Sequence, residues 1–185
     1  MLRAPSLAML LRILVMLVFC GIPETAQLFA QTLSDDQVKA AYLYNFAKFV
    51  EWPANKFAAA TSPVRFCILE DYSLEPELAR IVKGKSVGGR AIEIVQVQGG
   101  EQSRNCHILF INAVNSKRSH SLLDAVRGSA VLTVGESESF IEHGGMIAFV
   151  LIDDRVHFQV NHKAATDAGV YVSSRLLVLA KRVIE

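Results

Sequence analysis

The sequence predicts a single-domain α/β sandwich, in which a mostly parallel central sheet of about five to six strands has helices on both faces and ends in a C-terminal hairpin plus helix. The chain has 185 residues, 51% hydrophobic and 20% charged, which excludes disordered and fibrous classes. Short apolar runs alternate with helical patterns, as in buried parallel strands covered by helices. No internal repeat or low-complexity linker divides residues 31–185, so we expect one domain.

Residues 1–30 are expected to be a cleaved secretory signal peptide. Arg3 precedes an apolar run from Leu7 to Phe19, which is shorter than the roughly 20 residues that a membrane-spanning helix needs. Cleavage after the small residue Ala30 would release an exported mature protein. A lipoprotein acylated at Cys20 is the alternative, although a bulky residue stands where that processing requires a small one.

Charge argues against nucleic-acid binding. The signal peptide takes two of the 19 bases and one of the 18 acids, which leaves a formally neutral mature chain. Nucleic-acid binding needs a basic surface that displaces counterions. A protein partner is compatible with a neutral surface.

The cysteines that remain after cleavage are Cys67 and Cys106. An even number in an oxidising compartment predicts a disulfide between them. It would close a loop of about 40 residues and stabilise the fold by about 4 kcal/mol. Two buried reduced thiols are the alternative.

The mature chain begins with a predicted helix. Ser34-Asp35-Asp36-Gln37 has the form of a capping box, with acids at the positive end of the helix dipole. Pro53 is expected to end the helix. Trp52 lies at that end and can either close the core, which we favour, or anchor a partner. The predicted apolar face consists of Val38, Ala41, Tyr42, Phe46 and Phe49.

The middle of the chain alternates between strands and helices. Glu75 begins one predicted helix that Gly84 ends, and Ser116 caps another that Gly128 ends. Apolar or alternating runs predict strands over residues 64–69, 91–97, 106–111 and 130–134.

The last third of the sequence predicts a hairpin and a helical end. Runs 146–152 and 155–160 flank the turn residues Asp153-Asp154. Alternation in the second run should turn His157 and Gln159 outward. Asn161 is expected to cap a helix, and a helical pattern continues past Gly169 through Leu176, Leu179, Ala180 and Val183.

The sequence contains no pattern of catalytic residues, so we expect no enzyme, no cofactor and no metal. Gly84-Lys85-Ser86 resembles the end of a phosphate-binding P-loop, but it follows a helix rather than a strand. No two histidines have the spacing of a zinc enzyme, and His157 and His162 with Asp153 or Asp154 form at most a weak metal candidate. A nucleophile elbow is absent.

The block VKAAYLYNFAKFVEWP, residues 38–53, resembles the opening signature of the YfiR-like periplasmic proteins. Later blocks resemble that family in order and spacing, so the resemblance spans nearly all of the mature chain. These blocks cover residues 84–90, 106–111, 131–134, 144–147 with Asn161, and 168–177.

The resemblance implies a periplasmic α/β regulator, able to form a homodimer, that binds the periplasmic domain of an inner-membrane diguanylate cyclase and holds it inactive. It also implies that the protein is not an enzyme. Cys67 and Cys106 fall where one family disulfide would lie. The family can carry a second cysteine pair in the region of residues 143–152, which has none here, so a redox switch through that second bridge is in doubt.

We expect the partner to dock on Trp52, Lys56 and Phe57, together with His157 and Gln159 on an edge strand. Ordinary surface is the alternative for these five residues. A second hypothesis is a small-molecule binding module that acts on another membrane receptor or sensor kinase, since parallel sheets form ligand crevices. A hydrolase is the third hypothesis, and no motif supports it.

Overall fold

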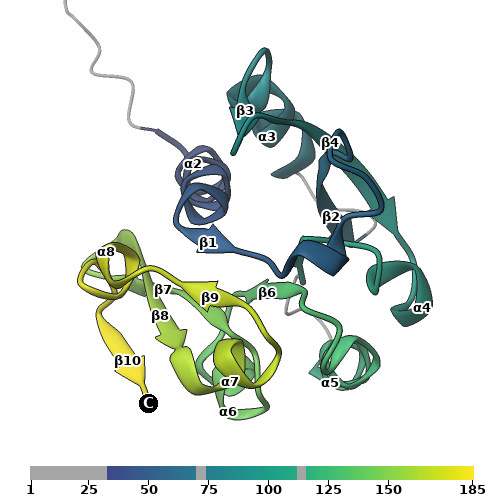
Figure 1. Cartoon of the computed structure of the whole chain (residues 1–185). Helices are drawn as coiled ribbons and strands as arrows, with labels where there is room; N and C mark the ends of the chain where they lie inside the picture. The colour runs from purple at the N-terminus through teal and green to yellow at the C-terminus, as the bar shows by residue number, and fades with distance from the viewer. Residues whose placement is uncertain (1–32, 70–73, 112–115) are drawn as a thin grey trace, which may run out of the picture. The chain divides into compact units, whose positions relative to one another are not determined.

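A computed structural model describes residues 33–69, 74–111 and 116–185 (Figure 1). The expected signal peptide lies outside the described residues. The elements are α2 (Asp35–Lys48), β1 (Val50–Glu51), a 3₁₀ turn (Ala54–Lys56), β2 (Val64–Leu69), α3 (Leu74–Val82), β3 (Ser86–Val87), β4 (Arg90–Val97), α4 (Gly100–Ser103), β5 (Ile108–Phe110), α5 (Ser116–Val126), β6 (Leu132–Gly135), α6 (Glu138–Glu142), β7 (Ile147–Ile152), β8 (Arg155–Asn161), α7 (His162–Asp167), β9 (Tyr171–Val172), α8 (Ser174–Leu177) and β10 (Arg182–Ile184).

The described strands form an eight-stranded sheet in the order β10-β8-β7-β6-β5-β2-β4-β3, and β1 pairs separately with β9. Neighbours from β7 through β6, β5 and β2 to β4 are parallel, as are β8 and β10. The β7–β8 hairpin and the β3–β4 pair are antiparallel. The α/β class is confirmed, but the sheet is larger than predicted and mixed rather than mostly parallel.

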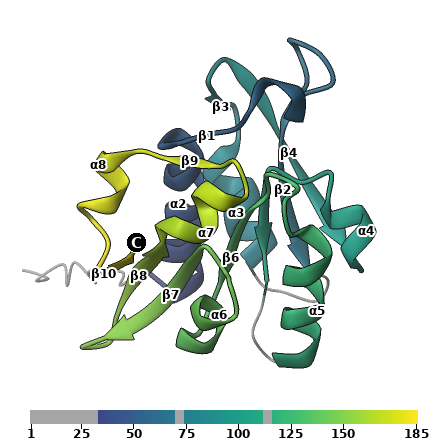
Figure 2. The same ribbon diagram turned by 60° about the horizontal axis from the view of Figure 1, so that its bottom comes forward.

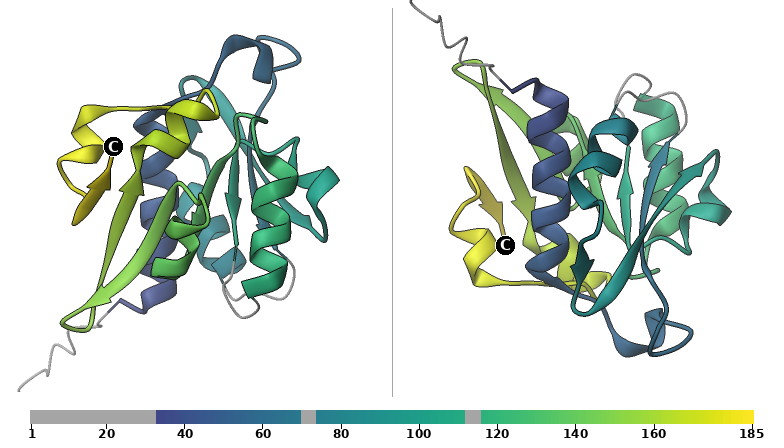
Figure 3. Two further views of the ribbon diagram at one scale, coloured as in Figure 1. Left: turned by 90° about the horizontal axis from the view of Figure 1, so that it is seen from below. Right: turned by 90° about the horizontal axis from the view of Figure 1, so that it is seen from above.

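Two hydrophobic clusters lie on the two faces of the sheet. In β2, Phe66 and Ile68 join the cluster that contains residues of α2 and α3, whereas Cys67 and Leu69 join the cluster that contains residues of α5 and α6. Successive side chains of a strand point to opposite faces, so a fully apolar strand serves both clusters. Figure 3 shows α2 and α3 in front of the sheet in one view and α5 in front in the other.

Helix α2 begins as predicted and ends earlier. Ser34 and Gln37 form the expected capping box, but the helix ends at Lys48, before Pro53, because the next residues pair with β9. Its buried residues are Ala40, Leu43, Phe46 and Ala47, so the predicted apolar face is rotated. The helix is apolar around much of its circumference, which makes the spacing a poor guide to the buried side.

The C-terminal hairpin is confirmed, with Asp153 and Asp154 at φ angles of 49° and 56°. Asn161 caps α7 by accepting a hydrogen bond from Ala164 N. The predicted C-terminal helix is wrong: α8 is short and is followed by β10, which pairs with β8 (Figure 2). Leu179, expected on an inner helix face, is therefore 63% exposed.

The pairing of β10 with β8 also corrects the prediction for Gln159. Strand β8 lies between β7 and β10 and is not an edge strand. Gln159 stands opposite Ala148 on one side and Arg182 on the other, and it is only 8% exposed. Its neighbour His157 is half-buried.

Candidate functional site

His107 stands at the centre of an aromatic and basic cluster just before β5. The residue is 4% exposed, and its backbone N donates to the Arg65 carbonyl oxygen at 2.9 Å. Its ring Nδ1 accepts a hydrogen bond from the backbone N of Arg65 at 3.0 Å. A neutral imidazole that accepts at Nδ1 carries its proton on Nε2.

Two aromatic side chains enclose the imidazole. Phe57 stacks on it with 4.4 Å between ring centroids, and Trp52 approaches at 5.5 Å with nearly perpendicular ring planes. Trp52 Nε1 also donates to the His107 carbonyl oxygen at 3.0 Å. The Arg90 guanidinium lies 3.8 Å from the centroid of the Phe57 ring, where a cation–π contact is favourable.

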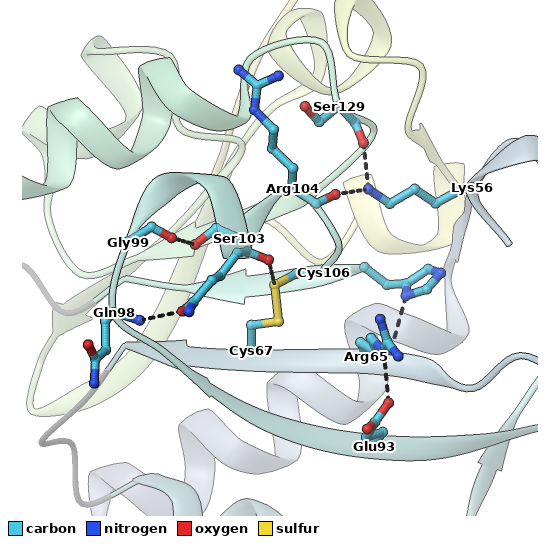
Figure 4. Close-up of a disulfide and its surroundings, with 12 residues drawn as sticks. Lys56, Arg65, Cys67, Glu93, Gln98, Gly99, Ser103, Arg104, Cys106 and Ser129 are labelled. Atoms are coloured by element: carbon cyan, nitrogen blue, oxygen red, sulfur yellow. Dashed lines mark hydrogen bonds and ion pairs between the residues drawn. A yellow bond between two sulfur atoms is a disulfide. The ribbon is translucent and has the colours of Figure 1, made fainter. Parts of the chain in front are cut away.

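Lys56 connects the loop before β5 to the loop before β6. Its Nζ donates to the Arg104 carbonyl oxygen at 2.7 Å and to the Ser129 carbonyl oxygen at 2.6 Å (Figure 4). Burial lowers the pKa of Lys56 to about 8. The ammonium is therefore still mostly protonated at neutral pH.

Electrostatics keep His107 neutral. Burial lowers its pKa to about 4, and the charges of Lys56, Arg65 and Arg90 act in the same direction. Arg65 pairs with Glu93 at 2.8 Å, so one carboxylate offsets part of this charge. The cluster as a whole is positive.

A cavity of about 310 Å³ adjoins this cluster. His107 contributes to its lining, and its Nε2 is buried without a hydrogen-bond partner among the described residues. The remaining lining residues are Asn55, Lys56, Ala58, Ser62, Pro63, Arg65, Arg104 and Asn105.

The predicted disulfide joins Cys67 in β2 to Cys106, the residue directly before His107 (Figure 4). Both cysteines are buried, and their Cα atoms are 5.8 Å apart, within the usual range for a disulfide. The alternative of two reduced thiols is not the state in this structure. The bridge holds the loop that carries His107 against β2.

The structure brings together only some of the proposed partner-binding residues. Trp52, Lys56 and Phe57 gather at His107 and are half-buried. His157 and Gln159 lie on β8, which is three strand spacings from β5, or roughly 14 Å.

Sequence reasoning missed His107, which it weighed only as a zinc ligand. It also missed Arg90. Each residue follows a recognisable feature of the sequence: Arg90 comes directly after the Gly88-Gly89 turn, and His107 comes directly after the disulfide cysteine Cys106. Arg90 Nη1 donates to the carbonyl oxygens of three loop residues, Ala59, Ala60 and Ser62.

The weak metal candidate gains no support. His162 Nδ1 lies 3.3 Å from Glu185 rather than beside the hairpin turn. Within residues 33–69, 74–111 and 116–185, no group of three or more His, Cys, Asp or Glu side chains could hold a metal ion. In the same residues, no helix combines the length and the apolar character needed to cross a membrane.

The fold is similar to that of a conserved domain protein from Vibrio cholerae O1 biovar El Tor, with a TM-score of 0.55 and 9% identity over 82% of this chain and 60% of that one. It is also similar to an ABC domain from Streptococcus pneumonia solved in complex with L-Trp, with a TM-score of 0.52 and 13% identity over 80% and 60%. The chain thus spans about 60% of the length of each, and at these identities the likeness shows the fold alone. No curated protein matches the sequence. The family described as YfiR/HmsC-like matches over residues 36–181.

Proposed function

The chain belongs to the YfiR/HmsC-like family, and we propose that it binds the periplasmic domain of an inner-membrane diguanylate cyclase and holds that enzyme inactive. The match over residues 36–181 carries this proposal. At the family level, such proteins are periplasmic regulators rather than enzymes. The Cys67–Cys106 disulfide is consistent with an oxidising compartment.

Inhibition by binding has a simple thermodynamic form. The regulator must bind the inactive conformation of the cyclase more tightly than the active one, because only differential affinity shifts a conformational equilibrium. Loss of the complex then releases the enzyme. No residue of the regulator needs to take part in catalysis.

For the docking surface we propose the exposed parts of Trp52, Lys56 and Phe57, with His157 as a separate contact. Gln159 is left out because it is buried. Aromatic side chains at the rim of a surface are frequent anchors of protein interfaces. The contacts of Trp52 and Phe57 with His107 hold them in place before a partner arrives.

The first test compares intracellular cyclic di-GMP in the source bacterium with the gene present and deleted. Deletion should raise cyclic di-GMP, and the mature protein should bind the purified periplasmic domain of the cyclase in calorimetry. His157→Glu should weaken that binding, whereas Arg80→Glu on α3 should leave it unchanged. No rise in cyclic di-GMP combined with no binding to the purified domain would reject the proposal.

Light scattering on the same preparation tests the homodimer that the family resemblance implies.

A small-molecule binding module is the second candidate function, and the cavity beside His107 favours it. This candidate would act on another membrane receptor or sensor kinase.

A further inference from the structure

We propose that the cavity beside His107 binds a small molecule through a phosphate or carboxylate group. The proposal rests on the charges, the buried donor and the fixed geometry of this cavity. It does not depend on the cyclase, so it can stand or fall separately from the regulatory function.

Three cations in or beside the cavity are not paired with carboxylates, whereas Arg65, which also lines it, pairs with Glu93. Lys56 and Arg104 line the cavity, and Arg90 lies beside it on the Phe57 ring. Among the described residues, none of these three forms an ion pair with a carboxylate. Lys56 and Arg90 instead donate to main-chain carbonyl oxygens, which leaves their net charge in place. A concave site of one sign attracts ligands of the other.

His107 adds a neutral donor to this charge. Its Nδ1 is occupied by the backbone N–H of Arg65, so Nε2 carries the proton and lacks an acceptor among the described residues. Buried polar groups in proteins nearly always have partners, and the exceptions call for an explanation. An oxyanion is an acceptor that can satisfy this N–H without any transfer of a proton, once the side chains that close off the buried Nε2 shift to admit it. A cationic or purely apolar ligand could not.

Much of the geometry is fixed before a ligand arrives. Lys56 is anchored on two carbonyl oxygens, and the loop that carries His107 is bound by the disulfide and by Trp52. Groups that are already ordered lose little entropy when they bind. The volume, about 310 Å³, is at the lower end of the range for small-molecule sites and suits a ligand no larger than a mononucleotide.

The test is an NMR titration of the ¹⁵N-labelled mature protein, in which the ring resonances of His107 report on the site. The probes are inorganic phosphate and succinate, added at constant ionic strength so that general screening does not change. The expected result is a saturable shift of the His107 Nε2 resonance. Arg104→Gln should weaken the affinity severalfold, because it removes one positive charge from a residue that lines the cavity. The matched control Arg80→Gln, in an exposed Arg80–Glu77 pair, should leave the affinity unchanged.

Each outcome decides the proposal. Saturation with phosphate alone assigns a phosphorylated ligand, saturation with succinate alone assigns a carboxylate, and saturation with both assigns anions of either kind. If neither probe gives a saturable shift up to roughly 10 mM, the site does not exist. Equal affinities for Arg104→Gln and Arg80→Gln would also overturn it. Should Arg104→Gln unfold, Lys56→Gln takes its place, with circular dichroism as the check on folding.

Discussion

At His107, burial and three neighbouring cations all favour the neutral imidazole. The pKa is lowered to about 4, against an ordinary value of 6.5. Below pH 6.5 the imidazole of His107 is therefore protonated in the unfolded chain but stays neutral in the folded chain. The free energy of unfolding consequently falls as the pH falls towards 4. Above pH 6.5 both states are neutral at this position, so the contribution is constant.

Replacing His107 with Gln should flatten this dependence. The loss of unfolding free energy between pH 7 and pH 4.5 should be smaller in His107→Gln than in the wild type by about 2 kcal/mol. Urea denaturation at a series of pH values measures it. Parallel profiles for the two proteins would show that His107 is not the titrating group.

Trp52 combines packing with a hydrogen bond. Trp52→Phe keeps an aromatic ring but removes the N–H that donates to the His107 carbonyl oxygen, and it should cost about 1 kcal/mol of stability. Trp52→Ala also removes the ring that packs on His107, and it should cost about 3 kcal/mol. Chemical denaturation checks both values, and an unchanged midpoint for Trp52→Ala would mean that Trp52 serves only a partner.

Among the elements, the β7–β8 hairpin has an identifiable weak point in its turn. Asp153 and Asp154 both adopt positive φ angles, which glycine and asparagine tolerate better. Asp153→Asn with Asp154→Gly should raise the free energy of unfolding by about 1 kcal/mol. Thermal unfolding tests this, and a lower melting temperature would contradict the turn geometry.

The contact between α6 and the strands on either side of it depends on two glycines. A Cβ at Gly145 would lie 2.2 Å from ring atoms of Phe140, and one at Gly135 would lie 2.5 Å from the same ring. Gly145→Ala should therefore destabilise the protein by more than about 2 kcal/mol, because the buried ring has to move. Gly99→Ala, which has open space around the added methyl group, is the control and should unfold at nearly the wild-type midpoint.

For the whole molecule, the Cys67–Cys106 disulfide restricts the unfolded chain. It spans 39 residues, and its removal should cost about 4 kcal/mol in the chain-entropy description. Cys67→Ser and Cys106→Ser should lower stability equally, and the double variant should add nothing, since each single change already removes the bond. Two thiols that react in protein from the native compartment would contradict the disulfide.

Features set by local chemistry were predictable from the sequence. Ser34 caps its helix, Gly84 and Gly128 follow their helices with positive φ, and Asn161 caps α7, because each depends on residues within a few positions. The β10 strand was not predictable. The spacing from Leu176 and Leu179 to Val183 fits a helix, and Arg182–Ile184 forms a strand only because it pairs with the distant β8. The burial of Gln159 depends on that same pairing.

The candidate site was partly predictable. The aromatic block that contains Trp52 and the cysteine pair pointed to the right region. The stacking of Phe57 on His107 and the clamp from Lys56 to Ser129 join residues 50 to 73 positions apart in sequence. No pattern in one segment reports such distant contacts.

The small β1–β9 pair sets a limit on how fast the domain can fold. It joins Val50 to Val172, so this strand pairing cannot form until the residues near the end of the domain are present. High contact order slows folding, because a long loop must close before its contacts contribute. A chain delivered N-terminus first cannot complete this contact until almost all of it has emerged. The domain should therefore complete its fold only late in its delivery.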